Sequence, residues 1–425
     1  MTQLYYPFHS LREGHWFNLI CGASFQHLPA VRNLTLAYAL AGADCIDVAA
    51  DPAVIAAAQD ALQVASKLGE EAQARGFGFR SRPLLMVSLN DGEDPHFRKA
   101  EFDPELCPAE CPRPCEKICP AQAIVFQKAS DGVSGVVDKC CYGCGRCLPV
   151  CPVELIYTRS YVSTPEAIAE LILQAGVDAL EIHTQVGHFA DFKRLLSAIA
   201  PWVERLKLLA ISCPDGDGLI DYLWTLHELI TPLPCPLVWQ TDGRPMSGDI
   251  GTGTTRAAVK LSQKVLTAGL PGYVQLAGGT NNHTVAKLKA AGLLNEAGLG
   301  TGELGVPSGD KGQWGLGRQG GFANTPLFPN TPLSSSNSQF PIPNPQSYVA
   351  GIAYGSYARV LLSPILDELE KFNGEEADAN LAWCPCPPLG QLETLPGLLW
   401  EAVESAHSLV SQLKSSRKLP QPIPN

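Results

Sequence analysis

Apolar residues along the chain follow two recurring patterns. Short apolar runs predict eight strands, at 16–21, 44–48, 84–89, 177–183, 208–212, 237–241, 273–277 and 348–353. Longer stretches with one apolar face follow nearly all of them and predict helices, at 28–40, 52–74, 167–175, 189–206, 219–230, 254–268 and 283–291. Several of these helices end at a glycine, which is the usual left-handed cap before the next strand.

Eight strands that alternate with helices predict an α/β fold, a (β/α)8 barrel of the TIM type. An open doubly wound sheet has similar content and is the alternative, but the strand count and the chain length favour the barrel. Active sites in such barrels lie at the carboxyl ends of the strands. The segment 90–163 follows the third strand, so we expect it at the mouth of the barrel, with 157–162 returning as a strand.

The candidate chemistry lies in this segment, which holds nine cysteines, eight of them in two spaced runs. Cys141, Cys144, Cys147 and Cys151 follow the C-x2-C-x2-C-x3-C-P run of bacterial two-cluster ferredoxins. Three thiolates on one loop can bind three corners of a cubane cluster, while the fourth corner lies too far away for the same loop. We therefore expect Cys151 to bind the other cluster and Cys119 to complete the cluster of this run.

The first cysteine run is less regular. Cys107, Cys111, Cys115 and Cys119 follow C-x3-C-x3-C-x3-C and are again followed by a proline. The last gap matches the ferredoxin ending, while the two earlier gaps are each one residue longer. This leaves open whether Cys107 reaches a cluster corner, so the first cluster is either 4Fe-4S or 3Fe-4S. Cys140, next to the second run, is predicted to be a spare cysteine that binds neither cluster.

Disulfides and structural zinc could also account for so many cysteines. Disulfides need an oxidising compartment, and the first 20 residues lack the pattern of a secretory signal peptide. Zinc would give no reason for the proline after Cys119 and after Cys151. Two iron–sulfur clusters in a reducing, cytoplasmic location are therefore the favoured interpretation.

Composition excludes two classes of partner. The formal net charge is -11 and only 17% of residues are charged, so the basic stripe of a nucleic-acid groove is missing. No apolar run approaches the ~18 residues of a membrane span, so we expect no integral membrane segment.

The predicted organisation is a barrel with two insertions. We expect 1–95 to form the first part of the barrel, 96–162 a ferredoxin-like iron–sulfur insert, and 163–294 the continuation of the barrel. The Gly-, Asn-, Pro- and Ser-rich segment 295–346 predicts a disordered insertion, with a functional lid as the alternative. The last strand and helix fall in 347–372. The remainder, 373–425, holds a tail and an amphipathic helix at 395–413 that either packs on the barrel or docks a partner.

The barrel itself offers a candidate ligand site. Gly278 and Gly279 follow the seventh strand, and Gly355 and Ser356 follow the eighth. Such turns form the phosphate cradle of many barrels and could hold a flavin phosphate; ordinary tight turns are the alternative. Polar residues also end several strands, namely Asp47, Asn90, His183, Asp242 and Arg244. A buried, hydrogen-bonded His183 is favoured over a catalytic one, and the catalytic residues remain unknown.

Segments on both sides of the cysteine block carry a family resemblance. Residues 19–24 (LICGAS) and 41–52 (AGADCIDVAADP) precede it, and residues 275–281 (QLAGGTN) and 349–359 (VAGIAYGSYAR) follow it. The chain resembles the cyanobacterial light-dependent period proteins, which are circadian-clock input components, over nearly all of its length except 295–346. The resemblance implies iron–sulfur clusters that report cellular redox state, and so light, to the clock. It also implies the clock input histidine kinase and the Kai oscillator proteins as partners, and eight cluster ligands: Cys107, Cys111, Cys115, Cys119, Cys141, Cys144, Cys147 and Cys151.

Two functions follow from these observations. The first is a redox-sensing regulator without its own enzymatic chemistry, favoured by the irregular first motif and the resemblance. The second is an iron–sulfur oxidoreductase whose clusters pass electrons to a flavin in the barrel. A plain electron carrier is a weaker hypothesis, because roughly 300 residues of barrel exceed the ~50–250 residues of a typical domain.

Overall fold

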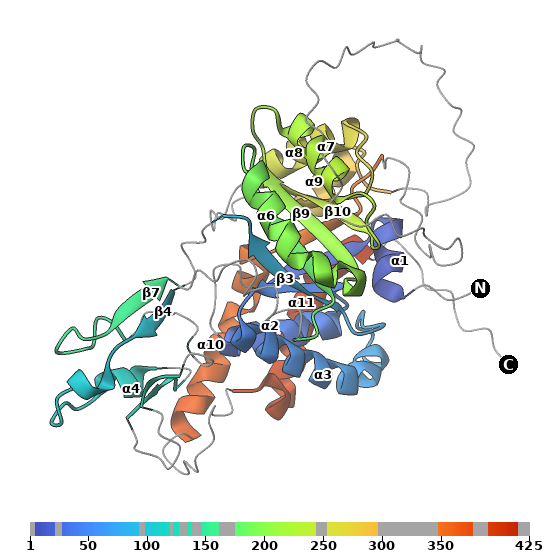
Figure 1. Cartoon of the computed structure of the whole chain (residues 1–425). Helices are drawn as coiled ribbons and strands as arrows, with labels where there is room; N and C mark the ends of the chain where they lie inside the picture. Colours follow the sequence, from blue (N-terminus) through green and yellow to red (C-terminus); the bar gives the residue numbers. More distant parts are fainter. Residues whose placement is uncertain are drawn as a thin grey trace, which may run out of the picture.

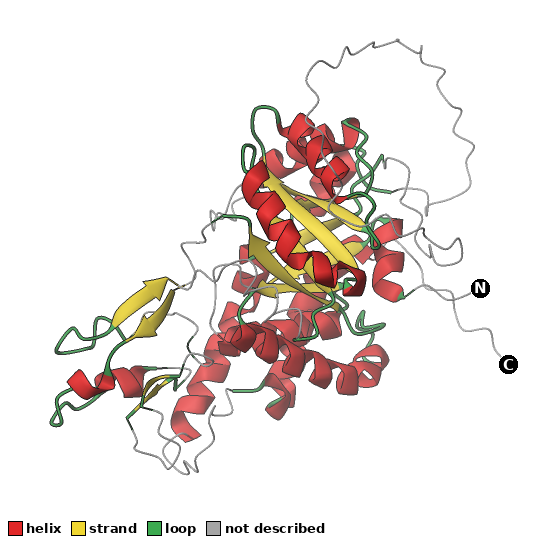
Figure 2. Ribbon diagram, in the orientation of Figure 1, coloured by secondary structure: helices red, strands yellow, loops and turns green. Residues whose placement is uncertain are grey.

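The computed structural model describes residues 5–21, 28–92, 98–119, 122–126, 134–137, 141, 147–160, 175–243, 253–295, 347–376 and 390–414. Within these ranges, eight parallel strands close into a barrel in the order β1-β12-β11-β10-β9-β8-β3-β2 (Figures 1 and 2). They are β1 (Trp16–Ile20), β2 (Cys45–Ala49), β3 (Leu84–Asn90), β8 (Ala179–His183), β9 (Leu208–Pro214), β10 (Leu237–Asp242), β11 (Tyr273–Ala277) and β12 (Gly351–Tyr354). Each corresponds to a predicted strand, which confirms the TIM-like barrel over the open sheet.

Helices surround the barrel (Figure 2). The α-helices described outside the cysteine segment are α1 (Tyr6–Glu13), α2 (Leu28–Ala41), α3 (Pro52–Ala74), α6 (Phe189–Ile199), α7 (Leu219–Ile230), α8 (Thr255–Thr267), α9 (Thr284–Ala290), α10 (Ser356–Glu376) and α11 (Pro396–Lys414). The helix predicted at 189–206 ends early and continues as the 3-10 helix η2 (Ala200–Arg205), because Pro201 removes a backbone donor. The predicted helix 167–175 and the predicted insertion 295–346 lie almost wholly outside the described residues.

The amino-terminal end of the barrel is filled by apolar side chains. One cluster inside it combines inward-facing residues at the strands with two residues of α1. The helix α1 itself was not predicted from the sequence. Its members are Phe8, Leu11, Trp16, Cys45, Leu84, Met86, Ala179, Leu208, Ala210, Val238, Tyr273 and Ala350. Outward-facing residues of the same strands pack against the helices; the ring of Phe17, for example, stacks on Tyr38 of α2 at 5.9 Å between centroids. The helix α1 therefore covers the end of the barrel opposite the mouth.

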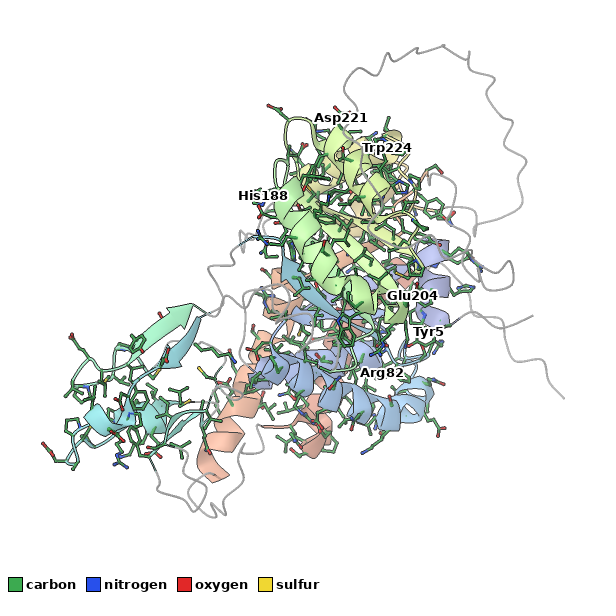
Figure 3. The ribbon with its side chains drawn as sticks, in the orientation of Figure 1. Tyr5, Arg82, His188, Glu204, Asp221 and Trp224 are labelled. Carbon is green, nitrogen blue, oxygen red and sulfur yellow. The ribbon has the colours of Figure 1, made fainter. Side chains whose placement is uncertain are left out.

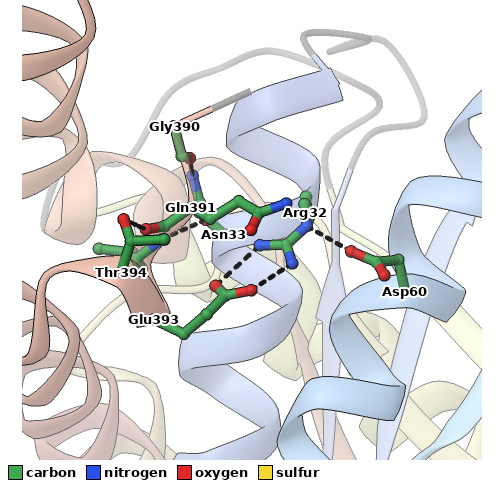
Figure 4. Close-up of polar contacts among 8 residues, drawn as sticks. Arg32, Asn33, Asp60, Gly390, Gln391, Glu393 and Thr394 are labelled. Carbon is green, nitrogen blue, oxygen red and sulfur yellow. Dashed lines mark hydrogen bonds and ion pairs between the residues drawn. The ribbon is translucent and has the colours of Figure 1, made fainter. Parts of the chain in front are cut away.

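The carboxyl-terminal helix α11 packs on the barrel, as one of the two interpretations of its apolar face predicted. Its buried face is formed by Leu399, Ala402, Val403, Ala406, Leu409, Val410 and Leu413. A buried arginine of α2 fixes the segment that leads into it (Figure 4). The Arg32 guanidinium donates to Glu393 of η3 (Leu392–Thr394) at 2.9 Å and to Asp60 of α3 at 2.6 Å. The amide of the adjacent Asn33 donates to the Gly390 carbonyl at 2.8 Å.

The cysteine segment stands out from one side of the barrel, between β3 and β8 (Figure 1). The strands β4 (Arg98–Glu101) and β7 (Tyr157–Ser160) pair antiparallel, which confirms the predicted return strand. Between them lie η1 (Pro104–Leu106), α4 (Pro114–Ile118), and a second antiparallel pair formed by β5 (Ile124–Val125) and β6 (Gly135–Val136). The two short sheets therefore frame the cysteine runs. None of the helices in the described part of the chain is long and apolar enough to cross a membrane.

Candidate metal centre

Four of the predicted cluster ligands come together in the insert. Partial burial raises the pKa of the Cys107 thiol, and neighbouring Cys111 and Cys151 raise it further. Burial also raises the pKa of Cys115, with added contributions from Cys151 and Cys107. Charges affect one another in this way only at short range. Cys107, Cys111, Cys115 and Cys151 therefore lie near one another, and their binding of one shared cluster stays a prediction.

The short helix α4 positions Cys115 within this group. Pro114 occupies its first turn, where a missing N–H is tolerated, and Cys115 is only 4% exposed. Arg113, just before the helix, has a left-handed φ of 51°. Its guanidinium lies 4.3 Å from the centre of the Phe126 ring, and its charge lowers the pKa of Cys107 against the effects of burial and the other thiols. The group thus has a positive charge beside it, which favours thiolates.

The turn after Cys119 directs a backbone donor at the sulfur. The N–H of Ala123 donates to Cys119 Sγ at 3.2 Å. This requires a left-handed residue, Gln122, whose φ is 45°. Hydrogen bonds of this type stabilise negative charge on a thiolate and raise the reduction potential of a bound cluster.

The same turn repeats after Cys151. Glu154 has a φ of 50°, and the N–H of Leu155 donates to Cys151 Sγ at 3.3 Å. Burial acts to raise the pKa of the Cys151 thiol, but the backbone N–H groups of residues 153–156 prevail and lower it. The two C-x3-C-P endings are therefore structural repeats, although the spacings that precede them differ.

The rest of the second run is described only in part. Cys141 and Cys147 are buried, at 8% and 7% exposure, while Cys144 and the predicted spare Cys140 lie outside the described residues. Every cysteine in the described ranges is a free thiol, so the disulfide alternative fails there. No three cysteine, histidine or carboxylate side chains in those ranges are arranged around a single metal ion. A cubane cluster takes one thiolate at each of four separate corners, so its ligands are spread more widely than those of one ion.

The predicted glycine turns lie at the mouth of the barrel, after the neighbouring strands β11 and β12. Gly278 and Gly279 have φ values of 70° and 89°, and a Cβ on Gly279 would lie 2.8 Å from the Thr254 carbonyl oxygen. Both the conformation and the close approach therefore require glycine at position 279.

The second turn is joined to the first by Thr280, whose hydroxyl donates to the Ala353 carbonyl at 2.8 Å. Gly355 precedes α10, and Ser356 is its first residue. The Arg359 guanidinium donates to the Ser356 hydroxyl at 3.0 Å. The four predicted residues thus meet at one end of adjacent strands, and their binding of a ligand stays a prediction.

The carboxyl half of the barrel interior contains acidic groups. Asp47, predicted as a strand-end residue, accepts from the Ser88 hydroxyl at 2.7 Å. Burial, and to a lesser extent Asp242, raise its pKa to about 6 despite hydrogen bonds and His183 acting in the opposite direction. Burial also raises the pKa of Glu181 well above its ordinary value, and the charges of Asp47 and Asp242 add to the effect. The three carboxyl groups are therefore close enough to oppose one another's ionisation.

Sequence reasoning missed Glu181 and the side chains that extend from it across the barrel. Gln240 donates to Glu181 at 2.5 Å, Gln275 donates to Gln240, and Trp16 donates to Gln275 at 2.6 Å. The available signal was a polar residue at an inward position of an apolar strand, as in ALEIH, VWQTD and YVQLA.

His183 faces the same group of side chains. Its Nε2 lies 3.2 Å from Glu181 Oε1, and the side chain is 29% exposed. It is therefore partnered, as the favoured interpretation expected, but it is not fully buried. Asn90 is exposed at the end of β3, and Arg244 lies outside the described residues.

Fold and site together define a class, a TIM-like barrel whose third βα connection is expanded into a cysteine-rich insert. Residues 107–162 match the LdpA Fe-S cluster-binding domain, and residues 171–412 match the Light dependent period A C-terminal domain. The chain is 52% identical over 289 residues to Light dependent period A of Synechococcus elongatus, which covers 68% of this chain and 78% of that protein. The chain therefore belongs to the Light dependent period A family, which confirms the resemblance, and it contains an iron–sulfur cluster-binding domain.

A more distant similarity involves a shorter part of the chain. The chain is 28% identical over 148 residues to a tetrathionate reductase subunit of Salmonella typhimurium, over 32% of this chain and 58% of that protein.

Proposed function

We propose that the protein is an iron–sulfur redox sensor that relays light or redox state to the circadian clock. Membership in a family named for a light-dependent period supports the clock assignment. The observation that carries the sensing role is the grouping of Cys151 with Cys107 and Cys115. The proposed partners are the clock input histidine kinase and the Kai oscillator proteins, and the proposed location is the reducing cytoplasm.

We assign the eight cysteines to two 4Fe-4S clusters. The first is bound by Cys107, Cys111, Cys115 and Cys151, and the second by Cys119, Cys141, Cys144 and Cys147. The grouping of Cys107 with Cys151 favours four ligands, and hence four irons, in the first cluster over the three-iron alternative. When bound, such clusters supply reversible one-electron transfer.

The residues of the insert adapt this site to sensing. The N–H groups of Ala123 and Leu155 stabilise negative charge on Cys119 and Cys151. Arg113 adds a positive charge near Cys107. Cys107 and Cys111 are only partly buried, so oxidants in solution can approach the first cluster more easily than one enclosed by protein.

The decisive experiment compares two neighbouring cysteines. We expect Cys141→Ala to lose iron and the light-dependent change in clock period, whereas Cys140→Ala should keep both. Iron and sulfide are counted after anaerobic purification, and period is measured in cells that carry each variant. Normal period control in a Cys141→Ala strain whose purified protein lacks the second cluster would refute the sensing role.

The second candidate function is an oxidoreductase with a flavin in the barrel. It is favoured by the meeting of Gly278, Gly279, Gly355 and Ser356 at one end of β11 and β12. Anaerobic protein that shows flavin absorbance, or takes up flavin mononucleotide stoichiometrically, would support it. Protein that binds no flavin would leave the sensor as the better proposal.

A further inference from the structure

We propose that the carboxyl half of the barrel binds a small organic cation, whose ammonium or guanidinium group lies against Asp47, Glu181 and Asp242. This site is separate from the cysteine insert. It also differs from a phosphate cradle, because its charged groups are acidic.

The two halves of the barrel interior differ in chemistry. The amino half is closed by α1 and filled by an apolar cluster. The carboxyl half is lined by inward-facing polar residues from seven of the eight strands, namely Asn18, Asp47, Ser88, Glu181, His183, Ser212, Gln240, Asp242 and Gln275. A barrel that only needs a stable core fills these layers with branched apolar side chains. The polar lining therefore indicates a ligand rather than a structural core.

The carboxyl groups are poorly compensated by protein charges. Glu181 is 0% exposed and Asp47 2%, and the basic group whose charge acts on both Asp47 and Asp242 is His183. Buried carboxylates without a cation are costly. A positively charged ligand would supply the compensating positive charge that the surrounding side chains lack.

A second observation is independent of the acidic groups. Asn18 is completely buried, and neither its Nδ2 nor its Oδ1 has a hydrogen-bond partner among the described residues. The alternation of β1 directs it inward, because Trp16 reaches Gln275 inside the barrel while Phe17 stacks on Tyr38 outside. Buried amides are normally satisfied, so the side chain is placed to contact a polar group within the barrel.

Register places Asn18 close to the acidic residues. Ile20 pairs with Asp47 across β1 and β2, so Asn18 lies one inward position below that pair. Across the barrel, Glu181 Oε2 also lacks a hydrogen-bond partner among the described residues. The ligand must therefore offer donors to Glu181 and to Asn18 Oδ1. Ammonium and guanidinium groups have several donors each, and a ligand with a hydroxyl or carbonyl nearby would also satisfy Asn18 Nδ2.

The chemistry and exposure of the lining residues favour an organic cation over a metal ion. Exposure increases toward the mouth, where His183 is 29% exposed and Asn90 is exposed. A metal ion is less suitable, since no three potential ligand side chains in the described part of the chain surround one point. A guanidinium or ammonium group can bridge carboxylates that are too far apart to share an ion.

Binding should release a proton. The titratable groups that face one another are Asp47 on β2, Glu181 and His183 on β8, and Asp242 on β10; the other strands contribute neutral side chains. Burial, with added repulsion between the carboxylates, raises the pKa of these groups and favours a retained proton, which a bound cation would displace to the buffer. Affinity should therefore increase as pH rises from about 5 to about 7, in proportion to that proton release.

The test uses anaerobically purified full-length protein with its clusters in place. The probes are n-butylguanidinium and n-butylammonium, with n-pentanol as the neutral probe of similar size and KCl as the control for ionic strength. Melting temperature and calorimetric titration are measured in two buffers of different ionisation enthalpy. We expect saturable binding of the cations with proton release, and no response to pentanol.

Two variants test the site and one serves as a control. Glu181→Gln and Asn18→Leu should each weaken cation binding at least tenfold, while retaining the iron content and circular dichroism of the parent. Glu204→Gln removes an exposed acid of η2, which lies far from His188 in Figure 3, so the variant should bind like the parent. The proposal is overturned by equal binding in all variants, by no saturable response to either cation, or by stabilisation with Mn²⁺ alone.

Discussion

The ammonium group of Lys99 lies 3.1 Å from the carboxylate of Asp51 and joins the cysteine insert to the barrel. Both side chains are buried, at 7% and 1% exposure. Asp51 also caps α3, because its Oδ1 accepts from the Ala53 N–H at 2.8 Å. This ion pair therefore connects β4 of the insert to the first turn of a barrel helix.

Breaking this ion pair should weaken the attachment of the insert to the barrel without removing iron from the insert. Lys99→Met leaves a buried carboxylate without its cation, which costs about 3–5 kcal/mol when a buried pair loses one partner. We expect faster hydrogen exchange at residues 98–101 and 157–160 and an unchanged iron content. The double variant Lys99→Met/Asp51→Asn should recover much of the loss, since Asn still caps α3. A single variant that exchanges like the parent would show that the pair does not hold the insert.

A protein without Cys151 should lose the first cluster and keep the second. The turn at Cys151 groups this thiol with Cys107 and Cys115, so Cys151→Ala should reduce iron from about eight to about four atoms per chain. Iron and sulfide analysis with EPR on anaerobic protein measures this. Cys140→Ala is the matched control and should retain about eight irons. Loss of all iron in Cys151→Ala would mean that the clusters do not assemble independently.

Removing the donor to Cys119 should lower the potential of the cluster that it binds. Ala123→Pro deletes the N–H that lies 3.2 Å from Cys119 Sγ. A difference of about 1 kcal/mol between oxidation states, which is typical of one hydrogen bond, equals about 40 mV for one electron. Ala123→Gly keeps the N–H and should leave the potential unchanged. Redox titration followed by EPR compares the two, and equal potentials would contradict the assigned role of this hydrogen bond.

The two carboxylates that bind Arg32 should differ in importance. Glu393 is 18% exposed and Asp60 53% exposed, while Arg32 is 5% exposed. Glu393→Ala leaves a buried guanidinium short of a partner and should lower the free energy of unfolding by about 3 kcal/mol. Asp60→Ala removes a solvent-exposed partner and should cost about 0.5–1 kcal/mol. Urea unfolding measures both, and similar losses would mean that exposure does not set the strength of these ion pairs.

Asp47 should make the barrel less stable as pH rises. Its pKa is raised to about 6, so the folded protein retains a proton that the unfolded chain releases between about pH 4 and pH 6. Stability from this site is therefore present at low pH and lost as pH rises through that window. Asp47→Asn should thus gain up to roughly 3 kcal/mol over the parent at about pH 7.5, and little at about pH 4. A difference between the two proteins that does not change with pH would show that Asp47 ionises normally.

Much of this architecture could be predicted from the sequence because the signals are local. All eight strands were recognised from apolar runs, and α3 was predicted to its observed ends, Pro52 and Ala74. Spacing also predicts that Cys151 binds the cluster of the first cysteine run, since a loop of fixed length can reach only certain corners of a cubane, and this assignment stays a prediction. Light dependent period A membership was evident from short segments that flank the cysteines.

Other features depended on residues that are distant in the chain. The sequence by itself determined which segments become strands and helices, because alternation and helical periodicity are properties of neighbouring residues. Only the tertiary structure decided that Lys99 meets Asp51, that Arg32 meets Glu393, and that Glu181 lies among other acids. A closed barrel brings the inward positions of eight separate strands into one small volume, and the chemistry of that volume is not visible in any single strand.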